Sequence, residues 1–250
     1  MVVCCIRMSP NVTGILLLWT LLPGPRAGRE PVCPAAAVAV LEAAEAAVLS
    51  GEFDVAFELL QGRATPGSAC AELAVATRAW AGWLAAASAA LLGGSAHALG
   101  GVRAQWEALG STGPGATDSA YATALLRAAA VAAQDERDEL QLWVEHARDL
   151  AARRALVKER ARWPLSIDLA EGELWSGVDD YELAEASYTR ALAERDSALG
   201  WRGLARARDR RGNRTGACAA YRRALDLASA AFPAGVVATE ARGYLLVCER

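Results

Sequence analysis

Histidine and lysine are almost missing from this 250-residue chain. Lys158 is its one lysine, and His97 and His146 are its only histidines, so few side chains could exchange protons near neutral pH or bind zinc. The sequence also has no His-Glu-x-x-His, Cys-x-x-Cys, Gly-x-Ser-x-Gly or phosphate-binding glycine motif. We therefore expect no catalytic residue, no metal site and no cofactor, and we expect that the protein is not an enzyme.

The few titratable groups of interest have structural interpretations. His97 has no acidic residue near it in the sequence, and His146 lies between Glu145 and Arg148 on a polar helix face, so we expect neither to be catalytic. The acidic run at residues 135–139 is typical of the start of a helix, where negative charge suits the helix dipole. A cation site made by this run is the alternative.

Aromatic and strand-forming residues are scarce as well. Phe, Trp and Tyr make up 6% of the chain and isoleucine and threonine are few, whereas alanine accounts for about a quarter and hydrophobic residues together for 54%. This composition argues against disorder and favours tightly packed helices. We predict an all-α fold. The bias toward alanine and arginine also indicates a GC-rich, bacterial genome.

A surplus of positive charge is absent. The formal charge is −3, and removal of residues 1–27, which contain Arg7 and Arg26 and no acidic residue, brings it to −5. The chain therefore has no overall attraction to polyanions, and its aromatic residues do not alternate with a basic stripe as single-stranded nucleic-acid platforms require. We expect no nucleic-acid partner.

Two uncharged, largely apolar runs bear on export and membranes. Residues 12–22 follow Arg7 and precede small residues that end at Ala27, which predicts a signal peptide over residues 1–27, with an uncleaved N-terminal anchor as the alternative. Residues 79–102 are long enough to span a membrane, but abundant alanine and a central glycine pair favour a buried hairpin. We expect no stable membrane span once the signal is removed.

The cysteines also favour export. Two of the six lie in the leader, so the mature chain keeps one pair near each end. An even number in an exported chain predicts disulfides, and we expect Cys33–Cys70 and Cys218–Cys248. Each would close a loop of roughly 30 to 37 residues and stabilise the fold by about 3 to 4 kcal/mol. Four buried free thiols in a cytosolic protein are the alternative.

A stretch rich in glycine, serine and threonine, residues 111–117, is predicted to be a linker between two regions. Residues 28–110 before it form an alanine-rich helical region, and residues 118–250 after it carry more charged, amphipathic helices. Outside the repeat described next, the expected helices are 34–50, 54–64, 69–92, 119–134 and 135–162.

Two segments in the second region repeat with a fixed offset. Residues 168–192 and 201–225 align with a shift of 33 residues, a period typical of stacked helical hairpins. Alanines would let the paired helices approach closely, tyrosines would fill the groove between them, and residues 179–180 and 212–213 would form the turns. The matching pairs are Ala184/Ala217, Tyr188/Tyr221, Ala191/Ala224 and Leu192/Leu225.

On these residues the chain resembles the tetratricopeptide repeat family. The resemblance is good over residues 164–229 and weaker over residues 119–154 and 36–62. Asp168 and Glu171 depart from the pattern, because the family has Trp and Leu at these positions, and neither repeat ends in the usual proline. The first repeat matches at Gly172, Trp175, Tyr181, Ala184, Tyr188 and Ala191, and the second at Trp201, Leu204, Ala205, Gly212, Ala217, Tyr221 and Ala224.

The resemblance implies a right-handed superhelix of antiparallel helix pairs in which the first helix of each pair lines a concave groove. We expect a small basic groove that binds an acidic peptide or a C-terminal carboxylate through bidentate guanidinium contacts. A solvated face, with its arginines balanced by nearby acids, is the alternative. The residues expected to face the groove are Leu169, Glu173, Arg202, Arg206 and Arg210.

A closing helix is expected over residues 234–248, because repeat arrays need a last helix that covers the exposed apolar face. Tyr244, Leu245 and Val247 would pack inward, and Cys248 would meet Cys218.

These features together predict an exported, non-enzymatic scaffold or adaptor that binds a protein or acidic peptide in the periplasm or cell envelope. The leader, the paired cysteines and the 33-residue repeat are its basis. The alternative is a carrier of a small apolar ligand or lipid, held by residues 69–110.

Overall fold

A computed structural model describes residues 35–60, 117–155 and 166–248. The expected signal peptide, the Cys33–Cys70 disulfide and the proposed ligand-carrying segment at residues 69–110 lie outside these described residues, as does the linker apart from Thr117. Chain contacts divide the protein into residues 1–31 and 32–250, and all the described residues belong to the second unit.

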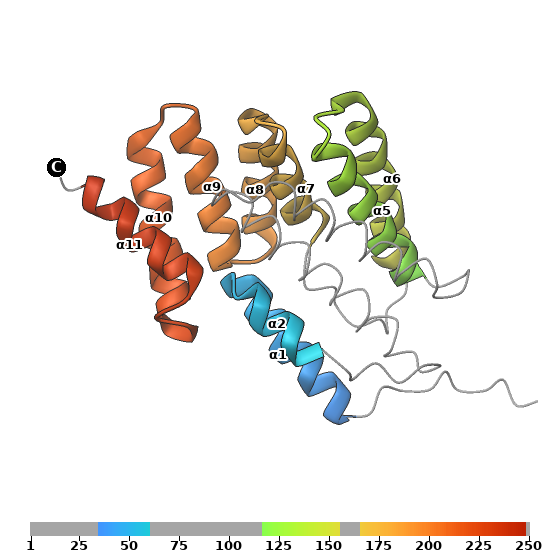
Figure 1. Ribbon diagram of the computed structural model, residues 1–250, viewed down its shortest axis with the longest axis horizontal. Helices are drawn as coiled ribbons and strands as arrows, with labels where there is room; N and C mark the ends of the chain where they lie inside the picture. Colours follow the sequence, from blue (N-terminus) through green and yellow to red (C-terminus); the bar gives the residue numbers. More distant parts are fainter. Residues whose placement is uncertain (1–34, 61–116, 156–165, 249–250) are drawn as a thin grey trace, which may run out of the picture. The chain divides into compact units, whose positions relative to one another are not determined.

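The described residues form α-helices and no strand, which confirms the all-α prediction (Figure 1). Within these same ranges, none of the helices has the length and apolar character that crossing a bilayer requires. The helices are α1 (Ala35–Ser50), α2 (Phe53–Leu60), α5 (Thr117–Ala132), α6 (Arg137–Ala155), α7 (Ile167–Gly177), α8 (Tyr181–Glu194), α9 (Ala198–Arg210), α10 (Arg214–Ala231) and α11 (Val236–Cys248).

The same tight turn joins the two helices of four pairs in the described residues. In each turn one residue has a positive φ: 83° at Gly51, 58° at Asp135, 58° at Asp179 and 80° at Gly212. The N–H of the following residue then bonds a carbonyl five positions earlier, as a left-handed residue at the end of a helix allows. These bonds are Glu52 to Ala47 (2.8 Å), Glu136 to Val131 (3.3 Å), Asp180 to Trp175 (3.0 Å) and Asn213 to Arg208 (2.8 Å).

Capping side chains fix the first residue of each helix from α7 to α10. Each cap accepts a hydrogen bond from the backbone N–H three residues later, which would otherwise have no partner inside the helix. Asp180 and Asn213 are offset by 33 residues, and each directly follows the positive-φ residue of its turn. The 33-residue repeat in the sequence is therefore also a repeat in turn conformation and helix capping. The caps are Ser166, Asp180, Ser197 and Asn213.

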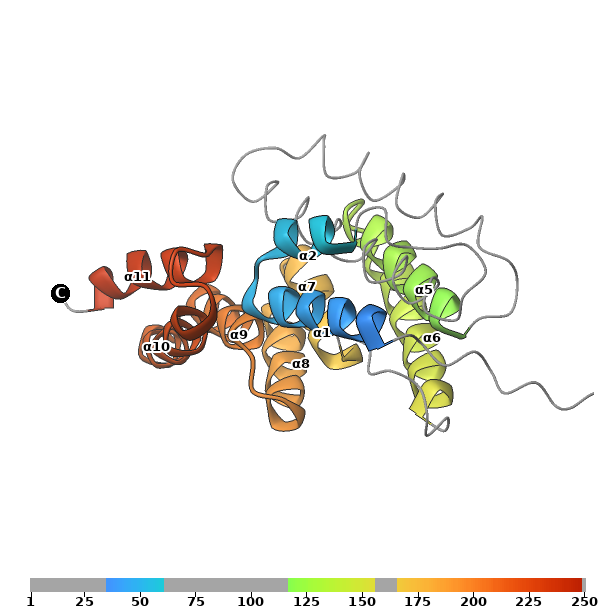
Figure 2. The same ribbon diagram turned by 90° about the horizontal axis from the view of Figure 1, so that it is seen from below.

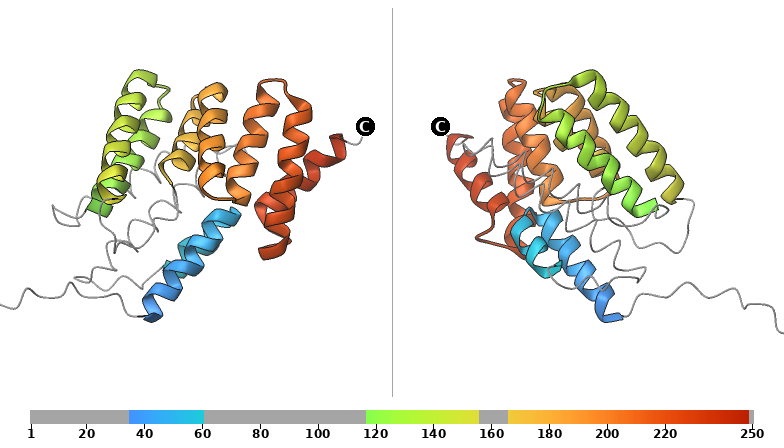
Figure 3. Two further views of the ribbon diagram at one scale, coloured as in Figure 1. Left: turned by 180° about the vertical axis from the view of Figure 1, so that it is seen from behind. Right: turned by 45° about the vertical axis from the view of Figure 1, so that its right-hand side comes forward.

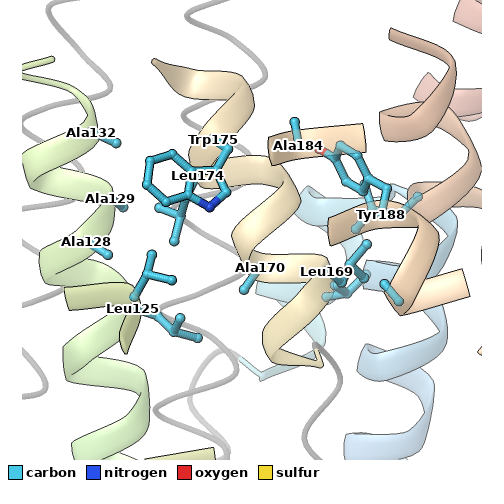
Figure 4. Close-up of a cluster of buried hydrophobic side chains, with 14 of the residues drawn as sticks. Leu125, Ala128, Ala129, Ala132, Leu169, Ala170, Leu174, Trp175, Ala184 and Tyr188 are labelled. Atoms are coloured by element: carbon cyan, nitrogen blue, oxygen red, sulfur yellow. The ribbon is translucent and has the colours of Figure 1, made fainter. Parts of the chain in front are cut away.

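From α5 onward, the helix pairs contact one another in chain order. The first helices α5, α7, α9 and α11 form a series in which each contacts the next, and the second helices α6, α8 and α10 also contact the helix that follows them (Figures 1 and 3). Figure 4 shows the junction of α5 and α7, where Leu174 and Trp175 lie toward small side chains of α5. The α5 residues at this junction include Leu125, Ala128, Ala129 and Ala132.

Tyr188 of α8 is wedged between the first helices of two consecutive pairs. A Cβ atom added to Gly172 of α7 would lie 2.5 Å from its ring, and one added to Gly203 of α9 would lie 2.2 Å from it. The tyrosine is fully buried, with Leu169 and Ala184 beside it (Figure 4). An aromatic side chain of one repeat therefore packs beside a small residue of the next, as the repeat alignment predicted.

Helix α11 packs against α9 and α10 at the end of the series (Figure 3). A disulfide joins its Cys248 to Cys218 of α10. Tyr244 and Leu245 pack against the core as expected, but the inward position predicted for Val247 is wrong, because its side chain is 46% exposed. The buried face of α11 instead begins at Val237, Ala238 and Ala241, and the disulfide-bonded Cys248 follows on it.

Candidate functional site

Three arginines of α9 lie on one helical face, because they are four residues apart. Arg202 is only 1% exposed, Arg206 is partly buried, and Arg210 is exposed near the end of the helix. The guanidinium groups therefore become more accessible along α9. Glu173 of α7 is partly buried near Arg202, and Leu169 is buried in the core.

Arg206 makes a bidentate salt bridge with Glu240 of α11. Its Nε and Nη2 atoms donate to the two carboxylate oxygens, both at 2.6 Å, and the Tyr221 hydroxyl donates to Glu240 Oε1 at 2.9 Å. This is the bidentate geometry expected for the α9 arginines, but the carboxylate comes from the chain's own closing helix.

These contacts set the charge states of the group. Burial would raise the pKa of Glu240, but the hydrogen bonds and charge of Arg206 more than offset burial and hold that pKa below its ordinary value. Burial and the Glu240 charge raise the pKa of Tyr221, so the phenol stays protonated. Arg206 stays charged, because the contact with Glu240 outweighs the burial that would lower its pKa.

Arg202 is buried with few hydrogen bonds. Its Cζ atom lies 5.7 Å from the centre of the Phe53 ring, and its Nη2 atom is 3.8 Å from Glu173 Oε2, beyond hydrogen-bond distance. Among the described residues, nothing accepts a hydrogen bond from Arg202 Nε or Nη1, and nothing donates one to Glu173 Oε1. The site therefore holds a buried guanidinium with unused donors.

Phe53 belongs to the α1–α2 pair, which packs against α9 and α10 (Figures 1 and 2). The residue before it, Glu52, accepts a hydrogen bond from the backbone N–H of Val236, the first residue of α11, at 2.9 Å. A carboxylate at this position satisfies an unpaired N–H and complements the helix dipole. We name Glu173, Arg202, Arg206 and Glu240, with Phe53 over Arg202, the α9 ion cluster.

The structure thus brings Glu173 together with Arg202 and Arg206, and α1–α2 and α11 cover much of these residues, whereas Arg210 lies over the Tyr181 ring. Arg202 and Leu169 do not reach solvent in this arrangement, whereas Arg210 does. Their role in binding a partner remains a prediction.

A second ion cluster lies between α6, α7 and α8. The carboxylates of Asp168 and Glu171 are 6% and 2% exposed, and Arg148 and Arg190 each contact both of them. Arg190 Nε lies 2.7 Å from Asp168 and its Nη2 atom 2.9 Å from Glu171, while the Ser187 hydroxyl also donates to Glu171 at 3.2 Å. Burial would lower the pKa of Arg148, but its two acidic partners raise it.

This second cluster explains the two departures from the repeat pattern. Asp168 and Glu171 occupy positions where the family has Trp and Leu. Both acidic side chains can stay buried because each carboxylate is paired with two guanidinium groups. The sequence pattern did not predict this cluster. An acid at an expected apolar position, with an arginine on each neighbouring helix, is the signal that indicates it.

The other groups considered from sequence lie at the surface or outside the described ranges. His146 is exposed and makes an edge contact with Trp143, with ring centres 5.8 Å apart. Asp138 and Glu139 lie in the first turn of α6, as the acidic run predicted. Across residues 35–60, 117–155 and 166–248, no three His, Cys, Asp or Glu side chains are grouped so that they could hold a metal ion.

Replacing Glu240 with glutamine tests the Arg206–Glu240 contact. Because the pKa of Glu240 is lowered by folding, its charge stabilises the protein above the pKa it has in the unfolded chain, about 4.3, and this contribution is lost as pH falls further. We expect the variant to lose about 1 to 2 kcal/mol at neutral pH, and the difference from wild type to shrink below about pH 4. Thermal unfolding followed by circular dichroism over this pH range measures it.

Glu194→Gln provides the control, because Glu194 is exposed at the end of α8. Its thermal midpoint should stay close to that of wild type at every pH. Equal losses in the two variants, or a Glu240→Gln deficit that does not change with pH, would contradict the assigned role of the Glu240 charge.

Comparisons of the chain with family models, with curated proteins and with solved structures found no match. Its function is therefore argued from the repeated helix pairs and from the α9 ion cluster.

Proposed function

We propose that this protein is an exported scaffold or adaptor of the tetratricopeptide repeat type, which binds a protein or acidic peptide partner without catalysis. The observation that carries the proposal is the turn shared by the three consecutive pairs α5–α6, α7–α8 and α9–α10, with a positive-φ residue at Asp135, Asp179 and Gly212. Turns of one geometry give successive pairs the same hairpin shape, and such pairs stack into an extended array whose first helices form one continuous face.

The contact order of the helices supports this architecture. Helices α5, α7, α9 and α11 contact one another in sequence, which is the arrangement expected of first helices in a right-handed superhelix of antiparallel pairs. Such a face presents side chains from several helices to one extended ligand, and in this chain it includes Arg210 of α9.

Export is supported by the apolar leader and by the cysteines. The disulfide between Cys218 and Cys248 suits an oxidising compartment, because cytosolic thiols are kept reduced. We place the protein in the periplasm or cell envelope, after removal of the signal peptide at residues 1–27.

The partner chemistry follows from the α9 arginines. Arg206 already holds a carboxylate, that of Glu240, with two hydrogen bonds. Arg210, one turn further along the same face, is exposed and can contact an acidic group of another molecule.

Site-specific photo-cross-linking in intact cells tests the proposal. A photoreactive residue at position 210, on the first-helix face, should give a discrete adduct with another envelope protein. The same residue at position 222, which is exposed on the second helix α10, is the matched control and should give none. Adducts at neither position would refute partner binding through this face, and adducts at 222 alone would move the interface to the second helices.

A further inference from the structure

The α1–α2 pair meets the last repeat through the turn between its helices. Glu52 and Phe53, adjacent in this turn, reach the start of α11 and Arg202 of α9 respectively. Gly51 lies so close to Val237 that an added Cβ atom would be 2.2 Å from its Cγ2 atom. One short acidic-aromatic segment therefore covers Arg202 of the α9 ion cluster and the start of α11.

This coverage uses only part of the binding capacity of Arg202. The Phe53 ring provides a cation–π contact, but no carboxylate reaches Nε or Nη1. A buried donor without a hydrogen bond is unfavourable, because it has lost its bonds to water. The segment that covers Arg202 thus leaves two donors for a better ligand.

We infer that the α1–α2 pair is a built-in competitor for the partner site, and that the partner presents an acidic residue beside an aromatic one, as Glu52 and Phe53 do. This inference rests on the proposed binding function. A partner segment of that kind places its aromatic ring over the Arg202 guanidinium and its carboxylate against the unused donors or the first N–H of α11.

The unused donors of the site favour such a ligand over a basic one. Arg206 is held by Glu240, and Glu173 lies 3.8 Å from Arg202 Nη2, so an arriving carboxylate meets a buried cation whose Nε and Nη1 donors have no hydrogen-bond partner in the described residues. A lysine or arginine at the same place would face Arg202 directly and would be repelled.

A peptide copied from residues 45–59, labelled with a fluorophore, tests this inference against the full-length mature chain. The release variant Glu52→Ala/Phe53→Ala removes the two contacts that hold the turn in place. Because the site is then open in more molecules, the peptide should bind the variant at least about tenfold more tightly than wild type, measured by fluorescence anisotropy.

Two matched controls make the result specific. The receptor variant Val55→Ala/Glu58→Gln alters exposed residues of α2 and should bind the peptide as wild type does. A peptide that carries glutamine at 52 and alanine at 53 should bind neither receptor.

Hydrogen exchange of the wild-type protein measures displacement of the α1–α2 pair without use of the release variant. In wild type, excess peptide should increase exchange of the α1 and α2 amides, because the displaced pair loses its contacts with α9 and α10. Equal affinity of wild type and release variant together with unchanged exchange would overturn the inference.

Failure of the inference is distinguishable from failure of the proposed function. If the peptide does not bind but position 210 still gives a partner adduct, the adaptor proposal stands and the competitor role of α1–α2 falls. If neither the peptide nor any envelope protein contacts this face, both are refuted.

Discussion

Replacing Gly203 with alanine should destabilise the protein by about 3 kcal/mol, although alanine is the better helix former. The added methyl group would lie 2.2 Å from the Tyr188 ring, and the ring cannot retreat because Gly172 of α7 confines its other side. Helices α7 and α9 must therefore separate, or the tyrosine must leave the core. Chemical denaturation followed by circular dichroism measures the loss.

Gly243→Ala is the matched control for this prediction. Gly243 lies in α11, and nothing lies within 4 Å of a Cβ atom added there, so the same change should stabilise the protein by up to about 1 kcal/mol. Replacing Tyr188 with the smaller leucine should remove much of the loss in unfolding free energy that Gly203→Ala causes. A double-mutant cycle of these two substitutions measures this coupling. Similar effects of the two glycine substitutions would show that Tyr188 does not separate the helices as described.

Loss of the Cys218–Cys248 disulfide is expected to cost about 3 to 4 kcal/mol, because the bond closes a loop of 30 residues in the unfolded chain. The double variant Cys218→Ala/Cys248→Ala removes it. Its thermal midpoint should fall, and the amides of α11 should lose protection from hydrogen exchange first, because the helix then depends on its contacts with α9 and α10 alone.

Reducing agent separates this disulfide from the one predicted at the other end of the chain. Reduced wild type should unfold at least as easily as the double variant. If Cys33 and Cys70 are also bonded, the double variant should remain sensitive to reducing agent, since a second loop is then opened. A double variant as stable as wild type would contradict the expected contribution of Cys218–Cys248.

The helix pairs could be predicted from sequence because their determinants are local. Alanine and tyrosine recur at one spacing in residues 168–192 and 201–225, and a residue that tolerates positive φ stands at each turn. The helix expected over residues 34–50 is observed as Ala35–Ser50 for the same reason, with Gly51 at its end.

The candidate site was harder to predict because burial depends on distant segments. Four-residue spacing places Arg202 and Arg206 on one face of α9, but it does not reveal that Phe53, about 150 residues earlier, covers the first of them. Glu240 likewise comes from another helix, and no pattern in α9 itself indicates that Arg206 has a carboxylate partner.

Val247 illustrates a limit of a different kind. Its apolar character suggested an inward position, yet Val237, Ala238 and Ala241 already form the face that packs, and Cys248 takes the last inward place. These packed residues and the disulfide lie on one face of α11, and Val247 beside Cys248 therefore points outward.

The hydrogen bond between Glu52 and Val236 joins positions 184 residues apart. During synthesis Glu52 is made well before Val236, so the carboxylate lacks this donor until α11 has been translated. Removing α11 should therefore loosen the turn between α1 and α2, and removing that turn should loosen the start of α11.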